Sequence, residues 1–173
     1  MVDFTIEGGW LNQLSVEIQH GRTVSRAMKD AAMESIKCTA REQQYVSGKW
    51  MLRLYPKDAD AVWPLIARAV AAGELGDSAK IGPTMDMHET ETTVCCVYVS
   101  NFDDRADVRR VLVALRRLVV PLGLEATLTG FKPNAFTMIE SKSNKKMKAT
   151  WRLAPTIYKV VDVLQDGWLA GGP

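Results

Sequence analysis

The stretch from residue 92 to residue 122 constrains the fold most strongly, because it predicts a buried strand, a sharp turn and a long helix in direct succession. The run Thr93–Val99 is dense in β-branched, aromatic and small apolar residues, and so short an apolar run is typical of a strand that is buried on both faces. Asn101, Asp103 and Asp104 then favour a turn, since these side chains bond their own backbone. Either aspartate is placed to cap the next helix.

The following segment, from about Asp104 to Val120, predicts an amphipathic helix packed through Val108, Leu112 and Leu115. Its apolar residues recur at helical spacing and its arginines fill the positions between them. The apolar set is Val108, Val111, Leu112, Leu115, Leu118 and Leu122, and the basic set is Arg105, Arg109, Arg110, Arg116 and Arg117. We interpret the arginines as a solvated helix face, with a dedicated anion site as the alternative.

Length and composition predict one globular domain. The 173 residues are 47% hydrophobic and 24% charged, which is ordinary usage for a globular protein with a real core. We expect residues 1–46 to form an N-terminal helical extension packed on a core of residues 47–165. No apolar run approaches the roughly 18 residues of a membrane span, and the first residues do not resemble a signal peptide. A cytoplasmic protein with no membrane partner is therefore expected.

The three cysteines, Cys38, Cys95 and Cys96, are predicted to be small buried hydrophobic residues. Cys95 and Cys96 are adjacent in a strand, so their side chains point to opposite faces and cannot serve one framework of disulfides. Only two histidines are present and no Cys-x-x-Cys spacing occurs, so no metal site is indicated. We expect a reducing environment and no cofactor.

The remaining chain predicts an α+β fold with a curved, mainly antiparallel sheet and helices packed on one face. We expect helices from Thr23 to about Gln44, with Thr23 or Ser25 as its cap, and from Asp58 or Asp60 to Gly73, with Pro64 in the first turn of the second. Further strands are expected at 49–55, 78–83, 125–129 and 135–139. Lys132-Pro133-Asn134 precedes the last of these strands.

Three groups of cations are candidates for an anion site. Lys49 and Arg53 lie on one face of the strand at 49–55, opposite Trp50, Leu52 and Leu54. Lys80 is the only charged residue of a short apolar strand, and the alternative for it is an edge charge that discourages aggregation. Residues 131–152 are rich in lysine, including Lys132, Lys142, Lys145 and Lys146, whereas residues 84–104 contain five acidic residues and no Lys or Arg.

No Walker loop, dinucleotide fingerprint, nucleophile elbow or His-Glu-x-x-His motif is present. A longer series of landmarks between Gly48 and Tyr158 does carry a resemblance. The landmarks are Gly48–Leu52, Trp63 with Ile66, Ala69-Val70, Gly73–Gly76, Ala79–Ile81, Val94–Val99, Phe102–Asp104, Asp107–Leu112, Leu115-Arg116, Phe131–Thr137 and Pro155–Tyr158. Together they resemble the basophilic-leukaemia-expressed protein family, whose fold is similar to that of the cap-binding translation initiation factor and whose members also resemble bacterial phosphothreonine lyases.

The lyase resemblance implies β-elimination of phosphate from phosphothreonine or phosphoserine in a peptide or protein. It implies Lys80 as the base that removes the Cα proton, which requires a depressed pKa, and Lys49 and Arg53 as groups that hold phosphate or polarise the substrate. Lys142, Lys145 and Lys146 are further phosphate ligands. This sequence departs from the lyase pattern at Met51, where those enzymes carry a histidine acid, and His88 is the candidate substitute.

Two other functions remain open. The resemblance to the cap-binding fold implies a binding module for a phosphorylated ligand, a nucleotide or an RNA cap, in which aromatic rings stack on a base beside a basic strip. Trp50 and Trp63 occupy expected core positions, which leaves Trp151 as the stacking candidate. A non-catalytic interaction protein is the third hypothesis, and elimination of phosphate is the first.

Overall fold

The computed structural model describes residues 25–142 and 155–170. Backbone contacts divide the chain into two compact units, each built from two stretches of sequence. The sheet unit comprises Ser47–Pro133 and Thr156–Pro173, and the helical unit comprises Met1–Val46 and Asn134–Pro155. The expected single domain with a core at 47–165 stays a prediction.

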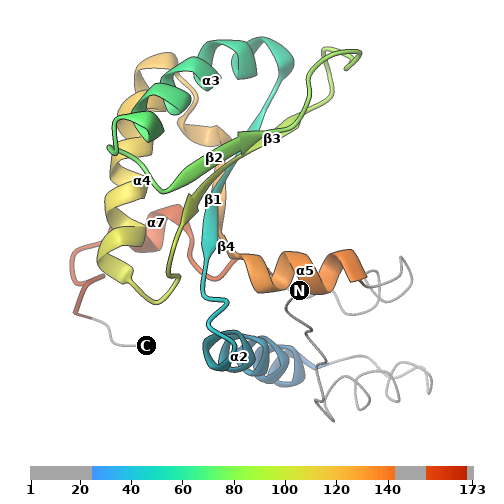
Figure 1. Ribbon diagram of the computed structural model, residues 1–173, viewed down its shortest axis with the longest axis vertical. Coiled ribbons are helices and arrows are strands. Elements are labelled where there is room, and N and C mark those ends of the chain that lie inside the picture. The colour runs from blue at the N-terminus through green and yellow to red at the C-terminus, as the bar shows by residue number, and fades with distance from the viewer. Residues whose placement is uncertain (1–24, 143–154, 171–173) are drawn as a thin grey trace. The chain divides into compact units, whose positions relative to one another are not determined.

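The sheet unit is built on four antiparallel strands in the order β2-β3-β1-β4 (Figure 1). The strands are β1 (Gly48–Leu54), β2 (Ser78–Ile81), β3 (Thr93–Val99) and β4 (Leu128–Pro133). The sheet is open and curved, so the predicted α+β class is confirmed. The strands predicted at 49–55, 78–83 and 93–99 are also confirmed.

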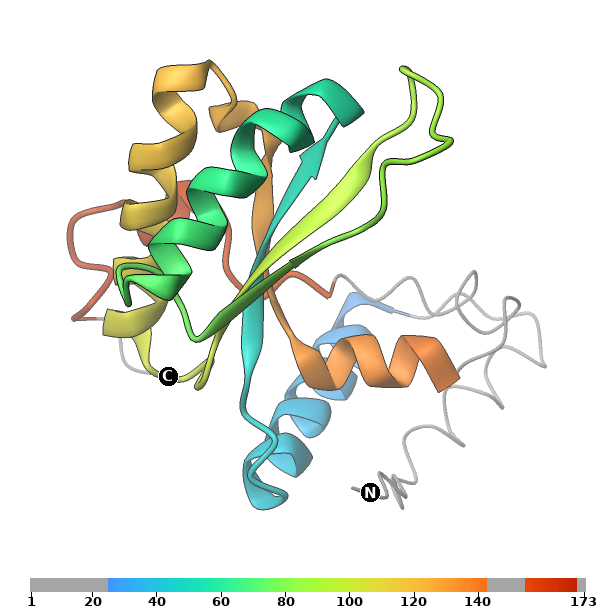
Figure 2. The same ribbon diagram turned by 45° about the horizontal axis from the view of Figure 1, so that its top comes forward.

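One face of this sheet carries the core. Along β1, Trp50, Leu52 and Leu54 are fully buried, and their neighbours on β3 are Val97, Cys95 and Thr93. The indole N–H of Trp50 donates to the carbonyl of Val108 in α4 over 2.9 Å. Both α3 (Pro56–Ala71) and α4 (Arg105–Val119) lie on this side of the sheet in Figures 1 and 2. The opposite set of side chains on β1 therefore points away from the two helices.

Helix α4 forms as predicted, because the cap at Asp104 and the apolar stripe that follows it favour the same helix. The carboxylate of Asp104 accepts the Asp107 N–H over 2.9 Å, which satisfies one of the free donors at the helix start. Val108, Leu112 and Leu115 are fully buried, as expected. After α4, the 3-10 turn η1 (Val120–Leu122) leads to Gly123 in the left-handed region with a φ of 71°.

Helix α3 differs from the prediction at its start. It begins at Pro56, with Tyr55 at the cap position, rather than at Asp58 or Asp60, and Asp58 lies in its first turn. Pro56 suits the first helical position because its missing N–H needs no partner there. Pro64 lies in the helix interior and not in the first turn. Pro64 has no N–H to donate to the carbonyl of Asp60. The helix tolerates this loss because Pro64 and Asp60 are both exposed, so water can bond the carbonyl.

The predictions for residues 125–139 were wrong in two places. Residues Glu125–Thr127 form the 3-10 turn η2, and the strand β4 starts only at Leu128 and continues through Lys132 to Pro133. The predicted strand at 135–139 belongs to the helix α5 (Asn134–Lys142). Ala135, Phe136 and Ile139 are buried, and this spacing fits a helix, whereas a run of five apolar residues by itself does not separate helix from strand.

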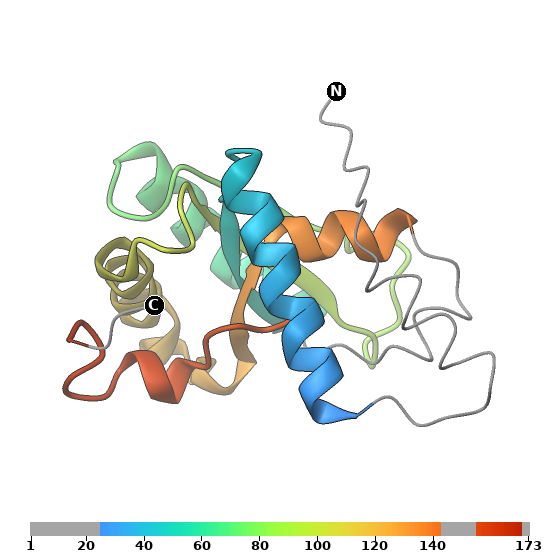
Figure 3. The same ribbon diagram turned by 90° about the horizontal axis from the view of Figure 1, so that it is seen from below.

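The helical unit contains α2 (Arg26–Glu42) and α5, which contact each other and cross in Figure 3. The hydroxyl of Ser25 accepts the Met28 N–H over 3.2 Å and caps α2, as one of the two expected caps. The buried residues of α2 are Ala32, Ile36 and Ala40. Their spacing at four residues confirms the predicted amphipathic helix.

The C-terminal stretch packs on the start of α4. Tyr158 bridges to Phe131 on β4, and its hydroxyl donates to the Phe102 carbonyl over 3.1 Å. The short helix α7 (Val160–Val163) follows, with Val163 fully buried. Trp168 then stacks edge-on against Tyr158 and lies under the guanidinium of Arg105, 3.7 Å from its ring centroid. These contacts fasten the end of the chain to the sheet unit.

Within residues 25–142 and 155–170, no helix is long and apolar enough to cross a membrane. That same part of the chain contains no cluster of His, Cys, Asp and Glu with the arrangement of a metal site. The three cysteines are free thiols. Cys95 and Cys96 are buried as expected, but Cys38 is exposed on α2, so the prediction for Cys38 was wrong.

Candidate functional site, the lysine face of the sheet

The strand register gathers cations on the sheet face that points away from α3 and α4. Lys49 on β1 pairs with Tyr98 on β3 and with Lys132 on β4. Lys80 on β2 pairs with Cys96, which in turn pairs with Met51. Side chains of directly paired residues stand on the same face, about 5 Å apart at their Cβ atoms. We call this set the lysine face: Lys49, Met51, Arg53, Ser78, Lys80, Cys96, Tyr98 and Lys132.

Tyr98 lies between two of the cations. The Nζ atom of Lys49 is 5.7 Å from the centroid of the Tyr98 ring, and the Nζ atom of Lys80 is 6.0 Å from it. Both distances fall within the range of a cation–π interaction. The two lysines that the sequence singled out separately, on β1 and on β2, therefore meet at one aromatic side chain.

The cluster has a buried and an exposed side. Only 6% of Lys49 and 8% of Lys132 is exposed to solvent, whereas Lys80 is exposed. Lysines are rarely buried to this degree. Lys49 and Lys132 stand directly opposite each other on β1 and β4, so the register brings two buried lysines side by side.

Three lysines lie close enough to Cys96 to affect the pKa of its thiol. Burial raises the pKa of the Cys96 thiol, and the charges of Lys49, Lys80 and Lys132 each oppose that rise. On the other face, burial raises the pKa of Cys95 to about 12 with a smaller contribution from Cys96. Both thiols therefore stay protonated and unreactive at neutral pH.

The environment of Lys80 favours the ammonium form. Tyr98 raises the pKa of Lys80, first through side-chain hydrogen bonding and then through the negative charge of its phenolate form, and these effects outweigh the slight desolvation of an exposed side chain. A general base needs the opposite shift. At neutral pH, Lys80 is suited to hold an anion.

The other β1 residues of the prediction lie along the same face. Arg53 pairs with Val94, is exposed, and lies four residues from Lys49, about 13 Å along the strand. It is therefore at the margin of the cluster and not at its centre. Met51 is half-buried between Cys96 and Gly130, so no titratable group stands at the position of the expected acid.

The expected substitute acid, His88, interacts within its own loop. This loop joins β2 to β3 and extends beyond the ends of both strands in Figures 1 and 2. The Nδ1 atom of His88 is 2.9 Å from the Thr90 hydroxyl, and its backbone N–H donates to the Glu91 carboxylate. His88 is exposed. These contacts hold it as a loop residue, and its role as an acid stays a prediction.

The predicted basic loop and its stacking residue cannot be placed at the lysine face. Lys145, Lys146 and Trp151 lie outside the described residues, as does the side chain of Lys142 at the end of α5. Of the other tryptophans, Trp50 is a core residue, as expected, and Trp63 is half-buried on α3.

Sequence reasoning did not place Tyr98 and Cys96 at the site, and it named Lys132 only as part of the basic stretch 131–152. The pairing of Lys49 with Lys132 places Lys132 in β4. Tyr98 and Cys96 are two residues apart in the predicted strand at 93–99, so alternation puts them on a common face. The sequence did not give the pairing register, which decides which residues of β1 and β2 stand opposite Tyr98 and Cys96.

The comparison with known families agrees with the landmarks on β1, β2, β3 and α4. A family model described as "Basophilic leukemia-expressed protein Bles03" matches residues 12–140. This range covers most of the 173 residues and includes every strand of the sheet. The chain therefore belongs to the Bles03 family.

Proposed function

We propose that the lysine face binds the phosphate group of a phosphorylated ligand, with a phosphothreonine or phosphoserine peptide as the first candidate. The observation that carries the proposal is the convergence of Lys49, Lys80 and Lys132 from three strands around Cys96. A phosphate monoester carries nearly two negative charges at neutral pH and three acceptor oxygens, which suits three ammonium groups.

The direction of access follows from burial. Lys80 is exposed and Tyr98 is half-buried, whereas Lys49 and Lys132 are buried. A ligand that approaches from the side of β2 would meet Lys80 and Tyr98 first. Arg53 and Ser78 lie on the same face and are exposed, so they are candidates to contact the peptide around the phosphate.

Elimination of phosphate is the second candidate function. The observation that favours it is that Lys49 and Lys80 both lie within 6.0 Å of the centroid of the Tyr98 ring. In this reaction a base removes the Cα proton, the Cβ–O bond breaks, an alkene forms, and phosphate departs with a proton from an acid. With Met51 at the expected acid position, the Tyr98 hydroxyl on the same face is a candidate replacement. The raised pKa of Lys80 argues against its role as the base, so binding ranks first.

One set of measurements tests both functions. Thermal shifts are recorded with inorganic phosphate, a phosphothreonine peptide, its unphosphorylated form, a capped dinucleotide and a plain oligonucleotide, because a ligand bound only by the native state raises the melting temperature. We expect the phosphopeptide to give the largest shift. The peptide is recovered and weighed, since elimination removes the mass of phosphoric acid and binding leaves the mass unchanged.

The variant Lys80→Gln removes the exposed charge, and Lys57→Gln, an exposed lysine in the first turn of α3, is the matched control. Loss of one charge-assisted contact is worth roughly 1.5–3 kcal/mol, so phosphopeptide affinity should fall about tenfold or more in the first variant and hold in the second. Equal affinity in all three proteins would remove the lysine face from consideration. A preference for the capped dinucleotide would favour the nucleotide-binding alternative.

A further inference from the structure

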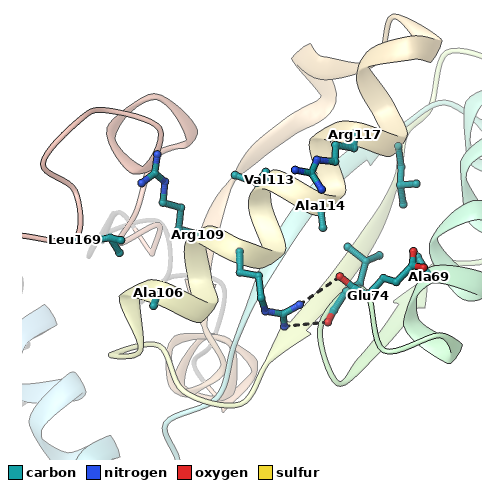
Figure 4. A pocket seen from close by; sticks show the side chains of 11 residues that line it. Ala69, Glu74, Ala106, Arg109, Val113, Ala114, Arg117 and Leu169 are labelled. Atoms are coloured by element: carbon teal, nitrogen blue, oxygen red, sulfur yellow. Dashed lines mark hydrogen bonds between the residues drawn. The ribbon is translucent and has the colours of Figure 1, made fainter.

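A second surface lies on the opposite side of the sheet unit, along the outer side of α4 (Figure 4). It is a shallow cavity of about 630 Å³, bordered on one side by Ala69 of α3 and Glu74 just after α3, and on the other by Leu169 near the C-terminus. We call it the α4 groove. It uses none of the residues of the lysine face.

The α4 groove has a basic rim. Arg109, Arg110 and Arg117 line it, against a single acidic residue, Glu74. Arg110 has a structural role, because its Nε donates to the Asp107 carboxylate over 2.7 Å and its terminal nitrogens donate to the carbonyls of Glu74 and Leu75 over 3.3 and 3.1 Å. The bonds to the two carbonyls are the dashed lines at the lower centre of Figure 4. Together these contacts fix the loop after α3 against α4.

Arg109 and Arg117 are different, because in the part of the chain that the structure describes neither forms an ion pair with an acidic residue. They are eight residues apart on one helix, which separates them by about 12 Å along its axis. In Figure 4 both side chains stand on the outer side of α4. Two guanidinium groups are thus available to charges presented two helical turns apart.

The remaining lining residues on α4 are apolar. They are Ala106, Val113, Ala114 and Leu118, of which Val113 and Ala114 lie between the two arginines, and Leu169 is at the margin. Leu169 is 55% exposed. The small alanine side chains allow close approach, so a ligand that fits the groove must itself carry apolar side chains between its charges.

We propose that the α4 groove binds an acidic amphipathic helix of a partner protein. Such a helix presents carboxylates two turns apart on one face with leucine or alanine between them, and this pattern complements Arg109, Val113 and Arg117 in both charge and spacing. A nucleic acid fits less well, because the lining residues include no aromatic ring for base stacking.

The test uses a fluorescein-labelled helical peptide of about 18 residues, or five turns, whose binding face carries two glutamates two turns apart with leucines between them. A second peptide replaces both glutamates with lysine, and binding is followed by fluorescence anisotropy. We expect the wild-type protein to bind the glutamate peptide, with affinity that falls as salt is raised, and not the lysine peptide. The double variant Arg109→Glu/Arg117→Glu should lose at least about tenfold in affinity for the glutamate peptide and gain affinity for the lysine peptide.

Lys159→Glu is the matched charge reversal, because Lys159 is exposed and does not line the groove. It should leave the affinity within about twofold of wild type. Both arginines lie outside the buried stripe of α4, so the double variant should melt within a few degrees of wild type, and circular dichroism checks this. No binding of the glutamate peptide by wild type, equal binding by wild type and double variant, or tighter binding of a single-stranded oligonucleotide than of the peptide would overturn the proposal.

Discussion

At the scale of single residues, the pKa of Lys80 depends on a neighbour on another strand. Lysine alone in a short apolar strand predicts either an edge charge or an amine whose pKa is depressed by burial. The pairing of Lys80 with Cys96 brings it beside Tyr98, two residues along β3, and the tyrosine raises the pKa of Lys80. This environment favours the charged form of Lys80, and its role as the base stays a prediction.

This shift predicts the pH dependence of ligand binding. The ordinary pKa of lysine, 10.5, is raised in the folded protein, so Lys80 keeps its charge throughout the neutral range and beyond about pH 10. A phosphate monoester takes its second negative charge near pH 6. Phosphopeptide affinity, measured by isothermal titration, should therefore rise from about pH 5 to about pH 7 and stay level to about pH 9.

The raised pKa of Lys80 also fixes how this interaction contributes to the stability of the fold as the pH changes. Because the folded protein holds the Lys80 proton more tightly than the unfolded chain, the contribution of this interaction is fully present below pH 10.5 and is lost as the pH rises through the folded value. A fall in phosphopeptide affinity between about pH 7 and about pH 9 that is absent in Lys80→Gln would contradict this account. An elimination rate that climbed across this range and depended on Lys80 would restore its role as the base.

At the scale of secondary structure elements, the junction of β2 with β3 depends on one glycine. Gly76 precedes β2, and a Cβ atom added to it would lie 1.8 Å from the carbonyl oxygen of Tyr98. This carbonyl accepts the Asp77 N–H over 3.2 Å, so the close approach is part of how β2 begins. Neither backbone can move without disturbing the pairing that brings Lys80 to the lysine face.

We expect Gly76→Ala to destabilise the fold by about 3 kcal/mol or more, since the clash is with backbone and not with a flexible side chain. Gly73→Asn is the matched control: Gly73 has a φ of +72°, which asparagine tolerates, and a Cβ atom added there would meet nothing within 4 Å. It should cost less than about 1 kcal/mol. Thermal melts compare the two, and similar losses in both would show that β2 and β3 adapt to the added carbon.

At the scale of the whole molecule, the sheet unit is assembled from two separate stretches of sequence. The second stretch is short, and aromatic contacts attach it. Trp168 is 9% exposed, packs against Tyr158 at a centroid distance of 4.9 Å, and donates its indole N–H to the Arg105 carbonyl over 3.2 Å. Its neighbour Leu169 is 55% exposed.

Trp168→Ala should therefore destabilise the protein by about 3–5 kcal/mol, the usual range for truncation of a buried tryptophan. Leu169→Ala should change the free energy of unfolding by less than about 0.5 kcal/mol, because the side chain is mostly in solvent. Urea unfolding followed by far-ultraviolet circular dichroism measures both. If Trp168→Ala unfolds at the same urea concentration as wild type, the C-terminal stretch contributes little to the stability of the sheet unit.

Some elements could be predicted from the sequence alone, because the residues that indicate them are close together in the chain. The apolar run at 93–99, the cap at Asp104 and the stripe through Val108, Leu112 and Leu115 each lie within one element, so their periodicity was sufficient. The shared face of Lys49 and Arg53 followed from alternation along β1.

Only the tertiary structure decided which strands are neighbours and in what register. The order β2-β3-β1-β4 joins Lys80, Lys49 and Lys132, which are far apart in the sequence, and no local pattern encodes that order. Residues 135–139 became helix because their apolar run suits either state until packing selects one. The direction of the Lys80 pKa shift was also decided by the tertiary structure. It depends on Tyr98, which only the pairing of β2 with β3 brings beside Lys80.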